Sequence, residues 1–153
     1  MAGTLDGKTI AFLAAEGVEQ VELTEPWQAV QDAGGTPELV SLEAGEVQAF
    51  NHLDKADTFP VDSTVAGADA DRYDGLVLPG GVANPDLLRA DADAVAFVRA
   101  FFEQAKPISV HGPWQITATG LAWSKNARTN PTASGSVRSA SGFATPPGST
   151  SAS

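Results

Sequence analysis

Three short segments of the 153-residue sequence contain side chains that could take part in acid–base or acyl-transfer chemistry. Each segment follows an apolar run, and the three cover residues 16–23, 78–86 and 110–114. If the apolar runs are parallel strands, all three segments lie at the carboxyl ends of strands, where open α/β sheets place their ligand sites. A carboxylate, a glycine pair with free N–H groups and a histidine would then meet. Together they could transfer protons and bind an oxyanion.

Five residues are the candidates within these segments. His111 is placed to accept a proton, and the carboxylates of Glu19 and Asp86 could orient its imidazole or hold a proton. The pair Gly80 and Gly81 could direct backbone N–H groups at an oxyanion. Each residue also has a purely structural interpretation. The glycines suit a tight turn, Glu19 a helix N-terminus, Asp86 a helix cap, and His111 a structural role. Their order and shared position at strand ends favour a common site.

The elements that must position these residues are indicated by the pattern of apolar side chains. Strands are expected over residues 8–15, 38–42 and 106–110, and residues 72–81 are expected to form a strand that runs into a Pro-Gly-Gly turn. Helices are expected over 19–33 and 91–104. The polar stretch 43–70 predicts a small β-arm, and 116–123 predicts at most a turn of helix against the sheet. Strands that alternate with helices predict a doubly wound α/β sheet rather than a β-sandwich.

Composition narrows the functional classes. All 19 acidic residues lie at or before Glu103, so residues 1–114 carry a net charge of −13 and residues 115–153 carry +3. An acidic body without a basic stripe argues against nucleic-acid binding. No apolar run approaches the roughly 18 residues of a membrane span, and the N-terminus does not resemble a signal peptide. The absence of cysteine excludes disulfides, thiolate metal ligands and a cysteine nucleophile. We expect a cytoplasmic protein with no metal or cofactor.

The chain is expected to divide into a domain over residues 1–123 and a tail over 124–153. Of the 39 residues after Trp114, 28 are Ser, Thr, Ala, Gly or Pro. Such a segment buries too little apolar surface to offset the entropy lost on ordering, so the tail is predicted to be disordered.

Several motifs occur together in a recognisable order. They are the Glu-rich segment 16–23, Phe59-Pro60-Val61-Asp62, the strand and turn 74–81, Lys106-Pro107 and His111-Gly112-Pro113-Trp114. Over residues 5–114 the sequence resembles the PfpI branch of the DJ-1/PfpI family, which is related to class I glutamine amidotransferase domains. The resemblance implies a flavodoxin-like parallel sheet with helices on both faces, here with its C-terminal part missing or replaced. It also implies a homo-oligomer.

The resemblance further implies roles for the candidate residues. Family members carry a nucleophilic cysteine directly before the histidine, and the acid after the first strand, matched here to Glu19, contacts that thiol. Gly81 would help to form the oxyanion hole with Gly80, and Asp86 would pair with His111 across a subunit interface. The implied activities are those of cysteine-dependent peptidases, glyoxalases and deglycases acting on peptides or small aldehydes, in the setting of stress protection.

The sequence departs from the family pattern at the nucleophile. Val110 precedes His111, and the segment after Pro107 is two residues short. Ser109 is the nearest hydroxyl, but strand alternation does not place it where the cysteine would be. Nothing after Trp114 resembles the remaining family elements. We interpret this as a frameshifted or degraded family member, with a genuine low-complexity tail as the alternative. Sequencing the locus separates the two.

Three functional hypotheses follow from the sequence. The first is an enzyme-derived stress-protection protein whose catalysis is impaired because it lacks cysteine. The second is a non-catalytic oligomerisation or stress-response module. The third is a flavodoxin-like domain that binds a small anion at Gly80 and Gly81, which ranks lowest because no glycine-rich phosphate loop follows the first strand.

Overall fold

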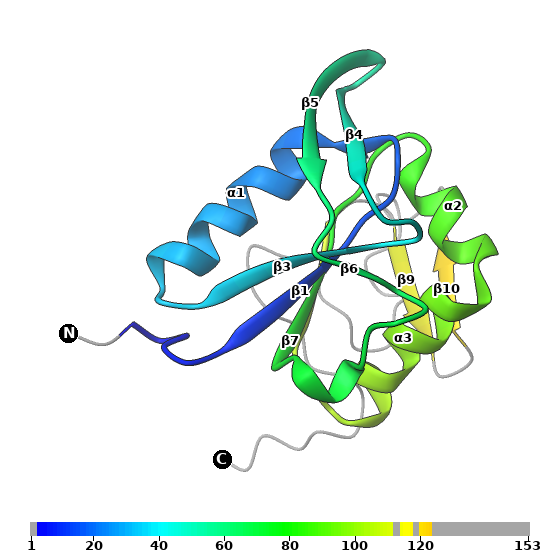
Figure 1. Ribbon diagram of the computed structural model, residues 1–153. Helices are drawn as coiled ribbons and strands as arrows, with labels where there is room; N and C mark the ends of the chain where they lie inside the picture. Colours follow the sequence, from blue (N-terminus) through cyan, green and yellow to red (C-terminus); the bar gives the residue numbers. More distant parts are fainter. Residues whose placement is uncertain (1–2, 112–113, 118–119, 124–153) are drawn as a thin grey trace.

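A five-stranded parallel sheet forms the centre of the protein (Figure 1). The computed structural model describes residues 3–111, 114–117 and 120–123. The sheet order is β6-β3-β1-β7-β8, and the strands are β1 (Thr9–Leu13), β3 (Thr36–Ser41), β6 (Ser63–Thr64), β7 (Gly75–Leu78) and β8 (Ile108–Val110). The predicted α/β class with a parallel sheet is therefore confirmed.

Helices cover both faces of this sheet (Figure 1). Helix α1 (Gln20–Asp32) lies on one face, and α2 (Asn84–Ala90) and α3 (Ala92–Glu103) lie on the other. A short 3-10 helix, η1 (Ala70–Arg72), leads into β7. The helix expected over 91–104 matches α3, and the helix expected over 19–33 matches α1, which continues through Pro26.

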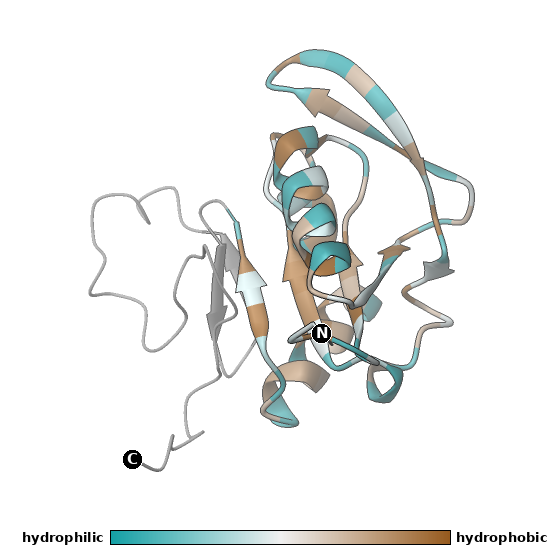
Figure 2. Ribbon diagram, turned by 90° about the vertical axis from the view of Figure 1, so that its left-hand side faces the viewer, coloured by the Kyte–Doolittle hydropathy of each residue, from teal (hydrophilic) through white to brown (hydrophobic). Residues whose placement is uncertain are grey.

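The alternation of side chains along β1 explains why the sheet needs cover on both faces. Ile10 and Phe12 pack into the core under α1, whereas Ala11 and Leu13 pack into the core under α2 and α3. All four are at most 2% exposed, which is why this strand reads as a continuous apolar run rather than an alternating one. Figure 2 shows the central strands in the brown of hydrophobic residues.

The polar stretch 43–70 forms the predicted β-arm. Strands β4 (Glu46–Asn51) and β5 (Asp54–Pro60) make an antiparallel hairpin that projects from the domain (Figure 1), and β2 (Val18–Glu19) pairs with β4 in parallel. The hairpin is anchored near the start of α1, because Gln20 and Asp57 exchange two hydrogen bonds of 2.9 and 2.8 Å.

The C-terminal part of the described chain differs from expectation. The turn of helix expected over 116–123 is wrong, because strands β9 (Trp114–Thr117) and β10 (Gly120–Trp123) form an antiparallel pair there. The segment contains Trp114, Ile116 and Trp123, residue types that favour strands. The predicted disordered tail over 124–153 lies outside the described residues.

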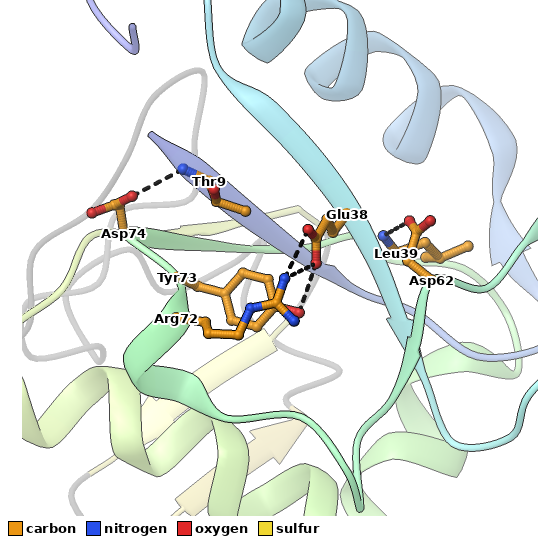
Figure 3. Close-up of polar contacts among 7 residues, drawn as sticks. All are labelled: Thr9, Glu38, Leu39, Asp62, Arg72, Tyr73 and Asp74. Atoms are coloured by element: carbon orange, nitrogen blue, oxygen red, sulfur yellow. Dashed lines mark hydrogen bonds and ion pairs between the residues drawn. The ribbon is translucent and has the colours of Figure 1, made fainter. Parts of the chain in front are cut away.

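A polar cluster fixes the entry into β7 at the end opposite the candidate site (Figure 3). The Tyr73 hydroxyl donates to Glu38 Oε2 at 2.9 Å, and Arg72 Nη2 contacts both carboxylate oxygens of Glu38 at 3.0 and 3.1 Å. Asp74 Oδ2 accepts from the Thr9 N–H at 2.9 Å. Burial raises the pKa of Tyr73, and its hydrogen bond to Glu38 and the charge of Glu38 raise it further. The cluster joins β3, β1 and the segment before β7.

Each of the two long helices, α1 and α3, is followed by a residue with left-handed backbone angles, but the residue type differs. Gly34 follows the last residues of α1 with φ of 88°, whereas Ala105 follows α3 with φ of 55°. The Lys106 N–H donates to the Phe101 carbonyl at 3.0 Å, so the left-handed residue is part of the cap that closes α3. A Cβ is disfavoured in this backbone region, and α3 therefore carries local strain at Ala105.

Replacing Ala105 with glycine is expected to raise the free energy of unfolding by about 0.5–1 kcal/mol, because relief of the left-handed alanine exceeds the entropy cost of glycine. Urea denaturation monitored by circular dichroism measures the change. Ala33→Gly is the matched control, since Ala33 ends α1 with φ of −83° and gains nothing from glycine. An Ala105→Gly variant that is no more stable than the wild type would contradict the inference that the backbone is strained at Ala105.

Candidate active site

The three predicted segments do meet at one edge of the sheet. Strands β1, β7 and β8 are neighbours and parallel, so the loops after Leu13, Leu78 and Val110 leave the sheet side by side. The loop after β7 is the Pro79-Gly80-Gly81 turn, and β8 leads directly into His111. This edge is where open α/β sheets bind ligands.

A carboxylate from α1 contacts the glycine turn. Glu22 Oε2 accepts a hydrogen bond of 2.6 Å from the Gly80 N–H. Gly80 is buried, and a Cβ at this position would collide with the Glu22 carboxylate and lie 3.1 Å from the His111 carbonyl oxygen. Glycine at this position therefore leaves the space beside the turn that the Glu22 carboxylate occupies.

The second glycine fixes the turn against β2. Gly81 has φ of 133° and forms an isolated bridge with Val18. A Cβ on Gly81 would lie 2.7 Å from the Glu19 backbone nitrogen, which itself donates to the Gly80 carbonyl at 3.1 Å. Both the backbone angle and the packing thus exclude a side chain here.

His111 occupies the end of β8 in a partly buried position. Its backbone N–H continues the ladder with β7 by donating to the Leu78 carbonyl at 2.9 Å. Burial lowers the pKa of its imidazole below the ordinary 6.5, and the negative charges of Glu22 and Glu25 oppose that shift. A neutral imidazole at pH 7 can accept a proton, as the sequence analysis expects of this residue.

The two acids of the first segment face different partners. The Glu19 carboxylate accepts from the backbone N–H of His52 at 2.9 Å, and its other oxygen lies 3.8 Å from His52 Nδ1. It is therefore turned toward the β4–β5 hairpin. Glu22, not Glu19, is the acid that contacts Gly80 and whose charge acts on His111. The two acids lie one helical turn apart, which is why residue type and spacing alone do not distinguish them.

Asp86 lies on the first turn of α2 with an exposed side chain. Its Oδ1 pairs with Arg89 Nη2 at 2.8 Å, an i,i+3 pair on the helix surface. The expected pairing of Asp86 with His111 requires a second subunit and stays a prediction.

The residue before His111 is aliphatic and packs in the core. Val110 is 1% exposed and pairs with Leu78 across the sheet. Ser109 is also buried, and its Oγ lies 3.5 Å from His111 Nε2. That distance is longer than an ordinary hydrogen bond, so the hydroxyl is poorly placed to pass its proton to the imidazole.

The described residues contain no cluster of three or more His, Cys, Asp or Glu able to hold a metal ion. None of the helices in the described ranges has the length and apolar character needed to cross a membrane.

The fold and the strand-end site define a flavodoxin-like α/β protein, and comparisons with known proteins specify its family. The model of the DJ-1/PfpI family matches residues 8–144, which extends beyond the 5–114 over which motifs are recognisable. The chain belongs to the DJ-1/PfpI family.

Curated relatives and a solved structure agree with this assignment. The chain is 36% identical to "Putative cysteine protease YraA" of Bacillus subtilis over 78% of this chain and 69% of the relative. It is 32% identical to Deglycase TK1284 of Thermococcus kodakarensis over 73% of this chain and 66% of the relative.

A two-domain protein of Anabaena variabilis with DJ-1/ThiJ/PfpI-like and ferritin-like domains has a TM-score of 0.63 and 25% identity. That match covers 69% of this chain and 29% of the Anabaena protein. The chain thus spans about two thirds of the two curated relatives and a smaller share of the solved structure.

Replacing Glu22 with glutamine is expected to lower the pKa of His111 further, because the substitution removes a negative charge that stabilises the imidazolium. The pH dependence of the His111 ring resonances in NMR measures it, with His111→Gln providing the assignment. Glu103→Gln, at the end of α3 that leads into β8, is the charge-matched control. A His111 pKa that rises or stays constant in Glu22→Gln would contradict the site geometry.

The same shift predicts the pH dependence of stability. The unfolded chain binds a proton at His111 more readily than the folded chain, so stability falls as the pH drops from about 6.5 to the lower folded pKa. The His111→Gln variant should lack this contribution of His111 to the slope of unfolding free energy against pH.

Proposed function

We propose that the chain is a stress-protection protein of the DJ-1/PfpI type, related to cysteine-dependent peptidases, glyoxalases and deglycases, whose own thiol chemistry is lost. One observation carries the proposal. Val110, buried in β8, stands where a nucleophile would precede His111, and the sequence contains no cysteine. An aliphatic side chain can neither ionise nor attack a carbonyl carbon.

The remaining polar groups do not replace the thiol. A serine needs a base within about 2.6–3.2 Å to become nucleophilic, and the Ser109 Oγ to His111 Nε2 distance is 3.5 Å. The Gly80 N–H, a candidate donor to an oxyanion, is already bonded to Glu22. A tetrahedral intermediate would therefore lack both its nucleophile and one of its stabilising donors.

The relatives indicate the substrate class that applies if any activity remains. One relative is named a deglycase and another a cysteine protease, so adducts of small aldehydes on protein and peptide bonds are the substrates to test. Both chemistries proceed through attack on an electrophilic carbon, and both require the missing nucleophile.

The purified chain is expected to release no adduct from methylglyoxal-treated protein above the rate in buffer, because it has no thiol. Deglycase TK1284 in the same assay is the positive control. Turnover abolished by iodoacetamide would reveal a contaminating intact relative. Turnover that resists iodoacetamide and disappears in His111→Gln would show that the chain itself is catalytic and would refute the proposal.

A second candidate function is a non-catalytic interaction module. Three apolar side chains are exposed on segments that also contribute residues to the site, namely Val21 on α1 at 46%, Val82 after the glycine turn at 60% and Leu87 on α2 at 42%. Exposed apolar side chains that form one contiguous patch are typical of contact surfaces. This observation supports a homo-oligomer that uses the site edge as its interface.

Light scattering is expected to give a mass above that of one chain, with Val82→Ser shifting the mass toward the monomer because it removes an apolar contact. Leu53→Ser is the control, since Leu53 is 80% exposed at the tip of the β4–β5 hairpin, away from the glycine turn. A monomeric wild type, or equal effects of the two substitutions, would exclude this interface.

The small-anion hypothesis has less support. The Glu22 carboxylate already occupies the Gly80 N–H, so an external anion would have to displace a negative charge and then lie beside it.

A further inference from the structure

Asn84 is fully buried, at 0% exposure, where the glycine turn passes into α2. Its Oδ1 accepts from the Ala15 N–H at 2.6 Å, and its Nδ2 donates to the carbonyls of Pro79 at 2.8 Å and Gly80 at 3.2 Å. These contacts fix the orientation of the amide. In the flipped orientation, the NH₂ group would face the Ala15 N–H, and the amide oxygen would face the two carbonyl oxygens.

A structural explanation for this asparagine would be helix capping, since Asn is favoured at helix N-termini. The structure does not show that role. The N-cap position of α2 is Ala83, and no side chain caps the helix there. The amide of Asn84 points away from the orphan N–H groups of α2 and instead binds the ends of two strands.

The contacts of Asn84 and Glu22 act on one peptide group. The Pro79 carbonyl and the Gly80 N–H belong to the same planar unit, and in a trans peptide they point in opposite directions. Asn84 holds the carbonyl end and Glu22 accepts from the N–H end. Rotation of this peptide would break both bonds together. A donor on the carbonyl also polarises the amide and strengthens its N–H as a donor.

Asn84 also connects this peptide to the neighbouring loop. Ala15 follows β1, and β1 is the strand beside β7 in the sheet. The hydrogen bond to the Ala15 N–H therefore keeps the first site segment at a fixed separation from the glycine turn.

We propose that Asn84 is the positioning residue of this site: it orients the Pro79–Gly80 peptide so that its N–H faces the carboxylate of Glu22, and it ties that peptide to the loop after β1. The inference goes beyond the proposed function, because it concerns an arrangement that exists with or without a nucleophile, and its test does not use catalysis.

The test follows the Gly80 amide by ¹H–¹⁵N NMR. In the wild type this amide proton should lie downfield, because a 2.6 Å hydrogen bond to a carboxylate deshields it. Glu22→Gln should move it upfield, because a neutral amide oxygen is a weaker acceptor, and this identifies the carboxylate as the source of the shift. In Asn84→Asp a carboxylate oxygen replaces the NH₂ donor and repels the Pro79 carbonyl. The Gly80 proton should then also move upfield.

Two controls separate positioning from a general loss of stability. Asn51→Asp makes the same chemical change at an exposed position, and Tyr73→Phe removes a partly buried hydrogen bond at the opposite end of β7. Both should leave the Gly80 signal as in the wild type. A folded Asn84→Asp protein with the wild-type Gly80 chemical shift would overturn the proposal.

A measurement on the wild type alone keeps the proposal testable if Asn84→Asp does not fold. The side-chain NH₂ protons of Asn84 should exchange with solvent far more slowly than those of the exposed Asn51, because the Asn84 NH₂ group is buried and donates to two carbonyl oxygens. Equally fast exchange of the two side chains would overturn the proposal.

Discussion

The hydrogen bond from the Gly80 N–H to Glu22 is the contact on which the site depends. It joins α1 to the turn after β7, although the two partners are 58 residues apart in the chain. The contact is possible only because residue 80 has no side chain, since a Cβ would occupy the space of the carboxylate. Asn84 holds the other end of the same peptide, and a buried polar arrangement of this kind is stable only when every partner is present. Among the described residues, no buried side-chain nitrogen or oxygen lacks a partner.

The described site combines an imidazole, a carboxylate and a glycine turn, and the sequence contains no cysteine. The partly buried imidazole of His111 has a lowered pKa, and a carboxylate lies close enough to influence it. Such a pair can accept and hold a proton, but proton transfer accelerates only a reaction for which a nucleophile is present. Val110 contributes packing to β8 at this point and no chemistry. Valine at this position is therefore compatible with the sheet but cannot act as a nucleophile.

The sequence predicts the scaffold well, because the sheet and its long helices follow from strong periodic patterns. Strand β1 is buried on both faces, so residues 10–13 are all apolar. Helix α3 is buried on one face, so its apolar residues recur with the period of a helix. The sequence also predicts that His111 and the glycine pair share one edge, since parallel strands end on the same side. It does not distinguish Glu19 from Glu22, because both acids begin the same helix and only tertiary contacts separate them. The contacts of Asn84 could not be predicted from the sequence for a related reason, since an Asn before a proline at the start of a helix normally indicates a helix cap.

The survival of the site geometry does not imply that selection for catalysis maintains it. Loss of the Glu22 contact would leave a charged group partly buried without its donor, and loss of Asn84 would remove the buried acceptor of the Ala15 N–H. Each unsatisfied buried group costs about 1–3 kcal/mol, against a total stability of about 5–15 kcal/mol for a domain. Folding alone is therefore sufficient to retain these residues. Folding does not require a cysteine before His111, and this chain contains none.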